Sequence, residues 1–241
     1  HYPLRRQRQM CIRDSLKYAI DFTKINGFDF SKFSIDNDGN VAAYSEYLLH
    51  YSNKFSNLIM LTFGTGVGGG IIAGGKLIRG SGSAGEVGHM LTSKGNEEYL
   101  CNCGKTGCFE ASTSAAAWTN ECKRLSKKYP ESELAMKFSE EKLGSIIFDR
   151  SINLNSEESA TRDKIIVNIS NGLVSLFEIF DNEAFILGGS MAGKPYDLVL
   201  LIDQDIKNRF KFPSRVFPQI LVSTQKGEAG IVGAALIARN E

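Results

Sequence analysis

The feature that most constrains the fold of this chain is an apolar hexapeptide that runs directly into a glycine-rich segment. Leu58–Phe63 has the length and composition of a buried strand. Seven of the twelve residues from Gly64 to Gly75 are glycine, so the backbone there can approach a ligand with no Cβ in the way. Successive exposed N–H groups in such a turn form a concave site for an anion such as phosphate.

Two common phosphate-binding motifs do not explain this segment. Gly64-x-Gly66-x-x-Gly69 has the spacing of the dinucleotide fingerprint, but that fingerprint must open a helix. Residues 71–78 instead read as two short apolar runs around Gly74-Gly75, which is typical of a hairpin. The Walker loop is excluded because no Gly-Lys-Ser/Thr follows at the required spacing. Glycines between two strands favour the actin-like nucleotide-binding folds, and the alternative is a plain glycine-rich hairpin without a ligand.

A histidine and three cysteines follow this hairpin: His89 and, within twenty residues of it, Cys101, Cys103 and Cys108. Three thiolates and an imidazole match the ligand set of a closed, structural zinc site. Because the C-x-C-x4-C spacing differs from that of the usual zinc finger, three loop thiols beside an unrelated histidine are the alternative. The remaining two cysteines, Cys11 and Cys122, do not make a disulfide framework, which indicates a reducing, cytoplasmic setting.

Three segments together resemble the signature of the ROK family, which comprises bacterial sugar kinases and sugar-responsive repressors. They are GTGVGGGII (64–72), GSAGEVGHM (82–90) and CNCGKTGCFE (101–110). The resemblance implies an α/β chain with the actin-like/ribonuclease H-like ATPase fold. It also implies ATP with Mg²⁺, a glucose-like hexose as substrate, structural Zn²⁺, and a homodimer when the protein is full length.

The segment that starts at Asp36 contains several carboxylate and amide side chains. On the residues alone, Asn37, Asp38 and Asn40 read equally well as an Asx-rich turn, with Asn40 as N-cap of a helix over residues 41–49. However, Asn-Asp-x-Asn-x-Ala-Ala with Glu46 behind it resembles the ROK catalytic segment. That resemblance implies that Asp38 is the general base, although Gly39 departs from the commoner alanine.

The resemblance implies roles for the other site residues as well. The residues expected to hold sugar hydroxyls are Asn37, Glu86, His89 and Glu110. Those expected to bind ATP are Gly64, Thr65 and Gly66 at the phosphates, with Gly188 and Gly189 over the adenosine. The expected zinc ligands are His89, Cys101, Cys103 and Cys108.

Apolar spacing along the rest of the chain predicts an alternation of helices and strands. Helices are expected near residues 16–22, over 41–49, 111–125, 157–180 and 228–238, and within 131–149. Strands are expected over residues 33–35, 58–63, 185–190 and 220–222. No apolar run approaches the length of about eighteen residues needed to cross a bilayer, so a membrane role is not expected.

The chain divides into three parts. Residues 1–15 lack apolar periodicity, and Met10–Asp14 back-translates to a sequencing-adapter sequence, so we expect a non-native leader. Without its four arginines and one aspartate the formal net charge of +1 becomes −2, which gives no basic surface for nucleic acid. Residues 16–51 are interpreted as a remnant of a first lobe with the catalytic segment, and 52–241 as a complete second lobe.

Two functions follow from these observations. The first is phosphorylation of a hexose, which the intact GTGVGGG segment and the Asn37-Asp38 pair favour. Because an Asp-x-Gly-Gly-Thr phosphate loop does not precede Ser15, we expect this chain to be an inactive fragment of such a kinase. The rival is the sugar-sensing half of a repressor, which binds a sugar without turnover.

Overall fold

The computed structural model describes residues 36–92, 100–141, 143–189, 197–225 and 229–240. The expected leader, the helix near residues 16–22 and the strand over 33–35 lie outside these ranges. Within them, no helix is long and apolar enough to cross a membrane.

One five-stranded sheet forms the centre of the molecule, in the order β3-β2-β1-β4-β5. The strands run over Leu58–Phe63 (β1), Val67–Ala73 (β2), Lys76–Leu77 (β3), Ala184–Gly189 (β4) and Gln219–Val222 (β5). The first three strands are antiparallel neighbours, whereas β4 and β5 run parallel to β1. The predicted hairpin, and the strands at 58–63, 185–190 and 220–222, are therefore confirmed.

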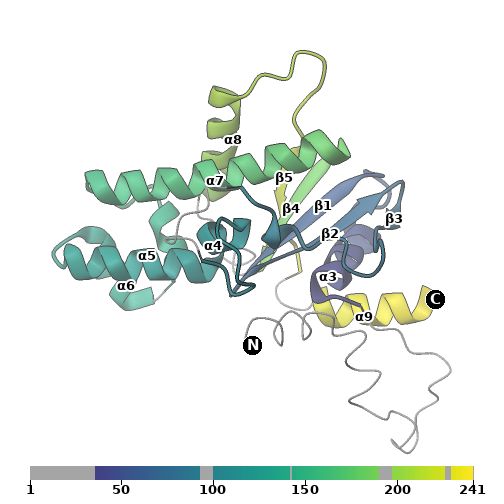
Figure 1. Ribbon diagram of the computed structural model, residues 1–241, viewed down its shortest axis with the longest axis horizontal. Helices are drawn as coiled ribbons and strands as arrows, with labels where there is room; N and C mark the ends of the chain where they lie inside the picture. The colour runs from purple at the N-terminus through teal and green to yellow at the C-terminus, as the bar shows by residue number, and fades with distance from the viewer. Residues whose placement is uncertain (1–35, 93–99, 142, 190–196, 226–228, 241) are drawn as a thin grey trace, which may run out of the picture.

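The helices cover both faces of this sheet. They run over Asp38–Glu46 (α3), Phe109–Thr113 (α4), Ala115–Lys128 (α5), Glu133–Glu141 (α6), Ser156–Phe180 (α7), Leu198–Arg209 (α8) and Ala229–Asn240 (α9). Figure 1 shows α7 along one face, with α3 and α9 together on the other. A π-helical turn over Tyr47–Tyr51 extends α3, and short 3-10 turns occupy Val87–His89 and Gly144–Phe148.

The central strands are buried on both faces because their alternate side chains enter two separate cores. Ile59, Leu61 and Phe63 face α5, α7 and α8, where the core continues through residues such as Trp118 and Leu173. Leu58 and Met60 point the other way, and pack with Ala43 and Tyr47 beneath α3. Apolar residues at five of the six positions of Leu58–Phe63 thus suit a strand that lies between two helical layers.

Helix α3 lies unusually close to β2 because glycines meet across the contact. A Cβ at Gly39 would stand 2.6 Å from the carbonyl oxygen of Gly69, and a Cβ at Gly70 would collide with that of Ala43. Three glycines of the glycine-rich segment, Gly68, Gly69 and Gly70, therefore lie within the strand itself. Only Gly64–Gly66 form the turn between β1 and β2, so the turn is much shorter than the glycine-rich segment.

Two of the expected helices differ from the observed ones, and one observed helix was not predicted. Helix α3 begins at Asp38 with Asn37 as its N-cap, so the prediction of Asn40 as the cap was wrong. The helix expected over 111–125 is two helices, because Ser114 is extended and its side chain caps α5 by accepting from the N–H of Ala117. No helix was predicted over α8. Its first turn is apolar, and its later turns are joined by ion pairs between residues four positions apart.

Candidate functional site

The glycine turn and the glycines of β4 lie at the same edge of the sheet. Because β1 and β4 are parallel, Thr62 pairs with Gly188 and Phe63 with Gly189, so both strands end side by side. The turn at Gly64–Gly66 follows directly from β1, and the N–H of Gly64 donates to the carbonyl of Gly66 at 2.9 Å. The structure thus brings together the residues predicted to contact ATP.

Asn37 and Asp38 stand at the N-terminus of α3. The Asn37 side-chain oxygen accepts from the N–H of Gly39 at 2.8 Å, and the Asp38 carboxylate accepts from the same N–H at 2.9 Å. Both side chains are exposed. The cap therefore uses one oxygen of Asp38 and leaves the carboxylate at the surface, where it can receive a proton from a ligand.

Glu86 and His89 lie next to this helix start. The Asn37 side-chain amide donates to Glu86 Oε1 over 3.4 Å, and His89 Nε2 is 4.0 Å from Glu86 Oε2. Glu86 is exposed and His89 is half-buried. The predicted sugar-binding residues Asn37, Glu86 and His89 therefore share one surface with Asp38, although they come from two separate segments.

Glu110, at the start of α4, connects this surface to the glycine turn. Its Oε1 is 3.6 Å from His89 Nδ1 and accepts from Cys101 Sγ at 2.9 Å. Its Oε2 accepts the backbone N–H of Val67 at 3.2 Å. A Cβ at Gly66 would collide with this Oε2, so any side chain there would displace the Glu110 carboxylate.

The four predicted metal ligands are brought together. One ligand atom each of His89, Cys101, Cys103 and Cys108 lies within 4.8 Å of the other three, and the cysteines are free thiols. Sulfur and nitrogen atoms around a tetrahedral zinc stand at about 2.0–2.3 Å from the metal, so such a cluster fits a closed site. His89 Nδ1 faces Cys101 Sγ at 3.7 Å, while Nε2 faces Glu86. One nitrogen is thus directed to the thiols and the other to the sugar-binding surface.

The thiols differ in their electrostatic surroundings. Burial, with the hydrogen bond to Glu110, raises the pKa of Cys101 well above its ordinary value, and burial likewise raises that of Cys108. Burial also acts on Cys103, but its hydrogen bonds with the backbone of Lys105 and with the other two thiols outweigh burial and lower its pKa. A metal cation would favour all three thiolates, because a coordinating thiol is deprotonated.

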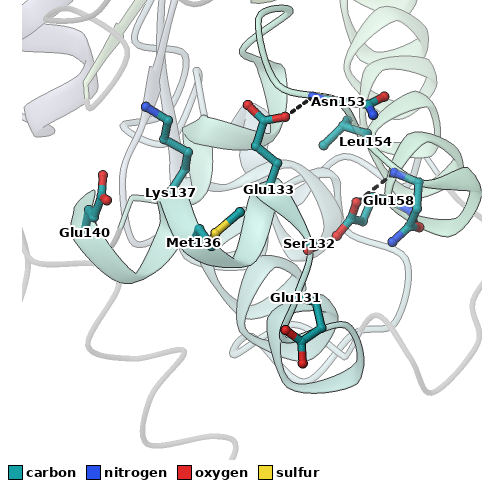
Figure 2. A pocket seen from close by; sticks show the side chains of 10 residues that line it. Glu131, Ser132, Glu133, Met136, Lys137, Glu140, Asn153, Leu154 and Glu158 are labelled. Atoms are coloured by element: carbon teal, nitrogen blue, oxygen red, sulfur yellow. Dashed lines mark hydrogen bonds between the residues drawn. The ribbon is translucent and has the colours of Figure 1, made fainter.

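A cavity of about 650 Å³ lies away from this site, between α6 and the start of α7. Figure 2 shows its acidic side chains with Met136 and Lys137. Two of the carboxylates already serve the local backbone: Glu133 accepts from the N–H of Asn153 at 3.0 Å, and Glu158 accepts from the N–H of Asn155 at 2.8 Å as part of a capping box. These bonds indicate that the two glutamates have a structural role.

Sequence reasoning missed the contacts of two carboxylates, Asp36 and Glu46, that hold the site in place. Arg79 Nε donates to Asp36 Oδ2 at 2.6 Å. Glu46 is fully buried, and accepts from the hydroxyls of Ser223 and Thr224 and the N–H of Gln225. The partners of Asp36 and Glu46 are 43 and 177 positions away, so no local pattern could reveal them.

Fold and site together define an α/β protein of the actin-like nucleotide-binding class, with a cysteine-rich loop beside its glycine hairpin. A sequence model of the ROK family matches residues 28–241, and the chain belongs to that family.

Its relatives include named sugar kinases. The chain is 28% identical over 219 residues to a glucokinase of Halalkalibacterium halodurans, covering 86% of this chain and 63% of that protein. It is 33% identical over 207 residues to an N-acetylmannosamine kinase of Haemophilus influenzae, covering 83% of this chain and 60% of the relative. The chain thus spans less than two thirds of the length of these two relatives.

Solved structures share the fold. A ROK family glucokinase from Streptomyces griseus, in complex with glucose and AMPPNP, superposes with a TM-score of 0.74 at 30% identity, covering 86% of this chain and 68% of that one. A ROK family transcriptional regulator, a homologue of the E. coli MLC protein, superposes with a TM-score of 0.68 at 23% identity over 85% of this chain and 51% of its own. The second likeness shows the fold alone.

Proposed function

We propose that the chain carries the catalytic base and the sugar-binding surface of an ATP-dependent hexose kinase. The observation that carries the proposal is the position of Asp38, an exposed carboxylate at the start of a helix that packs on the glycine strand β2. A kinase of this kind must deprotonate the attacking hydroxyl and hold the phosphates in line with it. The S. griseus relative, whose complex contains glucose and AMPPNP, supports the same assignment.

In the proposed reaction the sugar is held first. Asn37, Glu86 and Glu110 offer one amide and two carboxylates, which suit a polyol because each carboxylate oxygen accepts hydroxyl hydrogens. His89 Nε2, which faces Glu86, offers a further polar contact. Asp38 then accepts the proton of the hydroxyl that attacks the terminal phosphate, and the new O–P bond forms as the bond to ADP breaks.

The phosphates would lie at the sheet edge described above. The N–H groups of Thr65 and Gly66 are the donors proposed for them, while Gly64 closes the turn through its bond to the Gly66 carbonyl. Gly188 with Gly189 would contact the nucleoside. When bound, Mg²⁺ supplies positive charge that offsets the charge of the transferred group. The backbone of the turn can approach the phosphates closely because two of its three residues have no side chain.

The metal proposed for the cysteine loop is a structural Zn²⁺ held by His89, Cys101, Cys103 and Cys108. Four protein ligands leave no open position for a reacting water, so this metal would shape the site without taking part in the chemistry. Its effect would reach the sugar through His89 and Glu110, because both contact Cys101. The homodimer, the cytoplasmic location, and the division at residues 16–51 and 52–241 stay predictions.

The test combines two separate measurements: ADP release in an enzymatic assay, and glucose affinity by calorimetric titration. The assay uses a longer protein that contains this chain, because the chain by itself is expected to be an inactive fragment. Glucose and N-acetylmannosamine are compared with ATP present, and the Asp38→Asn variant serves as the control for background hydrolysis. Sugar-dependent ADP release that the variant lacks would support the proposal. Sugar binding without any ADP release would favour the repressor-like alternative, and the absence of both would count against a sugar site.

A further inference from the structure

Asp36 precedes the two site residues Asn37 and Asp38, and only 8% of its side chain is exposed. Its Oδ1 accepts hydrogen bonds from the Asn37 backbone N–H and from the side-chain amide of Asn40, both at 2.8 Å. Its Oδ2 accepts from Arg79 Nε at 2.6 Å. One carboxylate therefore joins the start of α3 to a residue on a different segment.

Arg79 stands at the beginning of the loop that ends at Glu86. Its carbonyl oxygen accepts from the N–H groups of Gly82 and Ala84, at 2.8 and 3.2 Å, so the residue also fixes the course of the loop. At the far end of the loop, Gly85 has a φ of +95° and packs so closely on β2 that a Cβ there would be 2.9 Å from the Gly69 carbonyl oxygen. The loop is thus anchored on both sides of its turn.

Asp36 and Arg79 meet where the helix start and this loop come together. A second direct contact between the same segments is the bond from Asn37 to Glu86, which at 3.4 Å is long for a hydrogen bond. The ion pair is shorter, joins two full charges, and is largely shielded by burial of Asp36. It is therefore the stronger of the two contacts that hold Asp38 and Glu86 at a fixed separation.

We propose that Asp36 and Arg79 are a positioning pair, which sets the separation between Asp38 and the sugar-binding residues Glu86 and His89. This inference rests on the proposed function, since it assigns the pair a task within that site. A hydroxyl held by Glu86 must arrive within hydrogen-bond reach of Asp38. A displacement of about 1 Å can cost on the order of 10²-fold in rate, so a contact that fixes this separation matters beyond its effect on stability.

The experiment uses the 241-residue chain and two measurements. Hydrogen exchange reports the order of residues 37–41 and 82–89 without a ligand, and calorimetry reports the affinity for glucose. The variants are Arg79→Met, Arg79→Lys, Asp36→Asn and the double variant Asp36→Asn/Arg79→Met. Arg215→Met is the matched control, because Arg215 pairs with Glu178 at 2.5 Å on an exposed surface formed by α7 and the segment after α8.

Arg79→Met is expected to speed exchange in both segments together and to weaken glucose binding by at least about tenfold, as when one partner of a desolvated charge pair is lost. Asp36→Asn should act alike, the double variant should be no worse than either single one, and Arg79→Lys should recover part of the loss. Arg215→Met should change neither measurement.

Loosening of one segment alone, or effects of the two changes that simply add, would overturn the inference. Unchanged glucose affinity in a variant whose two segments exchange faster would overturn it too, because the pair would then be only structural. If the unaltered chain binds no glucose, the proposed function loses its support. In that case hydrogen exchange alone still tests the pair. Faster exchange of residues 37–41 and 82–89 together, with effects of the two substitutions that do not add, would show that Asp36 and Arg79 couple the two segments.

Discussion

Glu110 Oε2 accepts the backbone N–H of Val67, the residue that follows the glycine turn, while its other oxygen lies beside His89 and Cys101. One carboxylate therefore contacts the proposed phosphate turn, the sugar-binding surface and the cysteine loop. Its position makes the order of the turn dependent on a residue 43 positions further along the chain.

Because each Glu110 oxygen has its own partners, two substitutions of Glu110 are expected to have different effects. Glu110→Gln keeps an oxygen that can accept the Val67 N–H, so hydrogen exchange in residues 64–67 should change little, whereas glucose affinity should fall because the charge is lost. Glu110→Ala should impair both, since it removes a charge-assisted hydrogen bond of about 1.5–3 kcal/mol. Glu86→Gln is the control: it should weaken glucose binding and leave exchange at the turn unchanged. Equal exchange in all three variants would disprove the contact's importance.

Asp38→Asn should abolish phosphoryl transfer in an active protein that contains this chain. The amide keeps the shape of the side chain and can still bond to the Gly39 N–H, but it does not accept the hydroxyl proton. Loss of a general base lowers the rate by about 10²–10⁴-fold. The check is ADP release at saturating glucose, with glucose affinity and melting temperature expected near their original values. A variant with near-original turnover would mean that Asp38 is not the general base and serves only in the helix cap.

One zinc per chain should be found by elemental analysis. Cys103→Ser should lower the metal content and the melting temperature together, because metal binding to a closed site contributes to folding free energy. It should also weaken glucose binding, since His89 and Glu110 contact the same loop. The control is Cys122→Ser, whose side chain lies outside the cluster and should leave the zinc content unchanged. A native protein without zinc would exclude the site.

Cys122 should resist alkylation in the folded protein. Burial, with the nearby Glu121 carboxylate, raises its pKa to about 12, and its side chain is fully covered within α5. At pH 8 the thiolate that reacts with iodoacetamide is therefore a very small fraction of the thiol. Mass spectrometry of the peptide that contains Cys122 should show no label in native buffer and full label in urea. Rapid labelling in native buffer would mean that α5 opens readily.

Glu46→Ala should destabilise the fold more than any loss of a surface carboxylate. The buried Glu46 side chain accepts hydrogen bonds from Ser223, Thr224 and the Gln225 N–H, so its removal leaves these donors without their acceptor. We expect a loss of at least about 2 kcal/mol in the free energy of unfolding. Glu178→Ala, at the exposed pair with Arg215, should cost about 0–1 kcal/mol. Urea denaturation of both variants makes the comparison.

Much of the sheet could be predicted from the sequence, because the strands Leu58–Phe63 and Phe185–Gly189 carry their signal in consecutive residues. The site residues were found through the same segments and their resemblance to a family. The start of α3 was misplaced because Asn37, Asp38 and Asn40 all favour caps, and the choice between them depends on the fit of Gly39 against Gly69. That fit is a tertiary contact, which cannot be predicted from local sequence propensity.

The remaining misses have the same cause. Ser114 lies between Ala111-Ser112-Thr113 and a run of alanines. Its extended backbone and capping side chain begin a second helix, which the apolar pattern of the sequence did not separate from the first. Asp36 and Arg79 are ordinary charged residues in the sequence, and only the packing of the loop against α3 makes them a pair. Contacts between distant segments thus account for the part of the site that the sequence pattern did not reveal.

The close packing of α3 has a consequence for biosynthesis. A Cβ at Gly233 of α9 would collide with the carbonyl oxygen of Val41, and Ser223 reaches Glu46 across 177 positions of sequence. At about 5–20 residues per second, a ribosome needs roughly ten to forty seconds to make that intervening chain. Through this interval the glycine hairpin can already pair, while one flank of the helix that begins with Asp38 has no cover. The nascent chain therefore leaves one flank of this helix uncovered until α9 has been made, and a chaperone that shields short-lived apolar surfaces would have a target there.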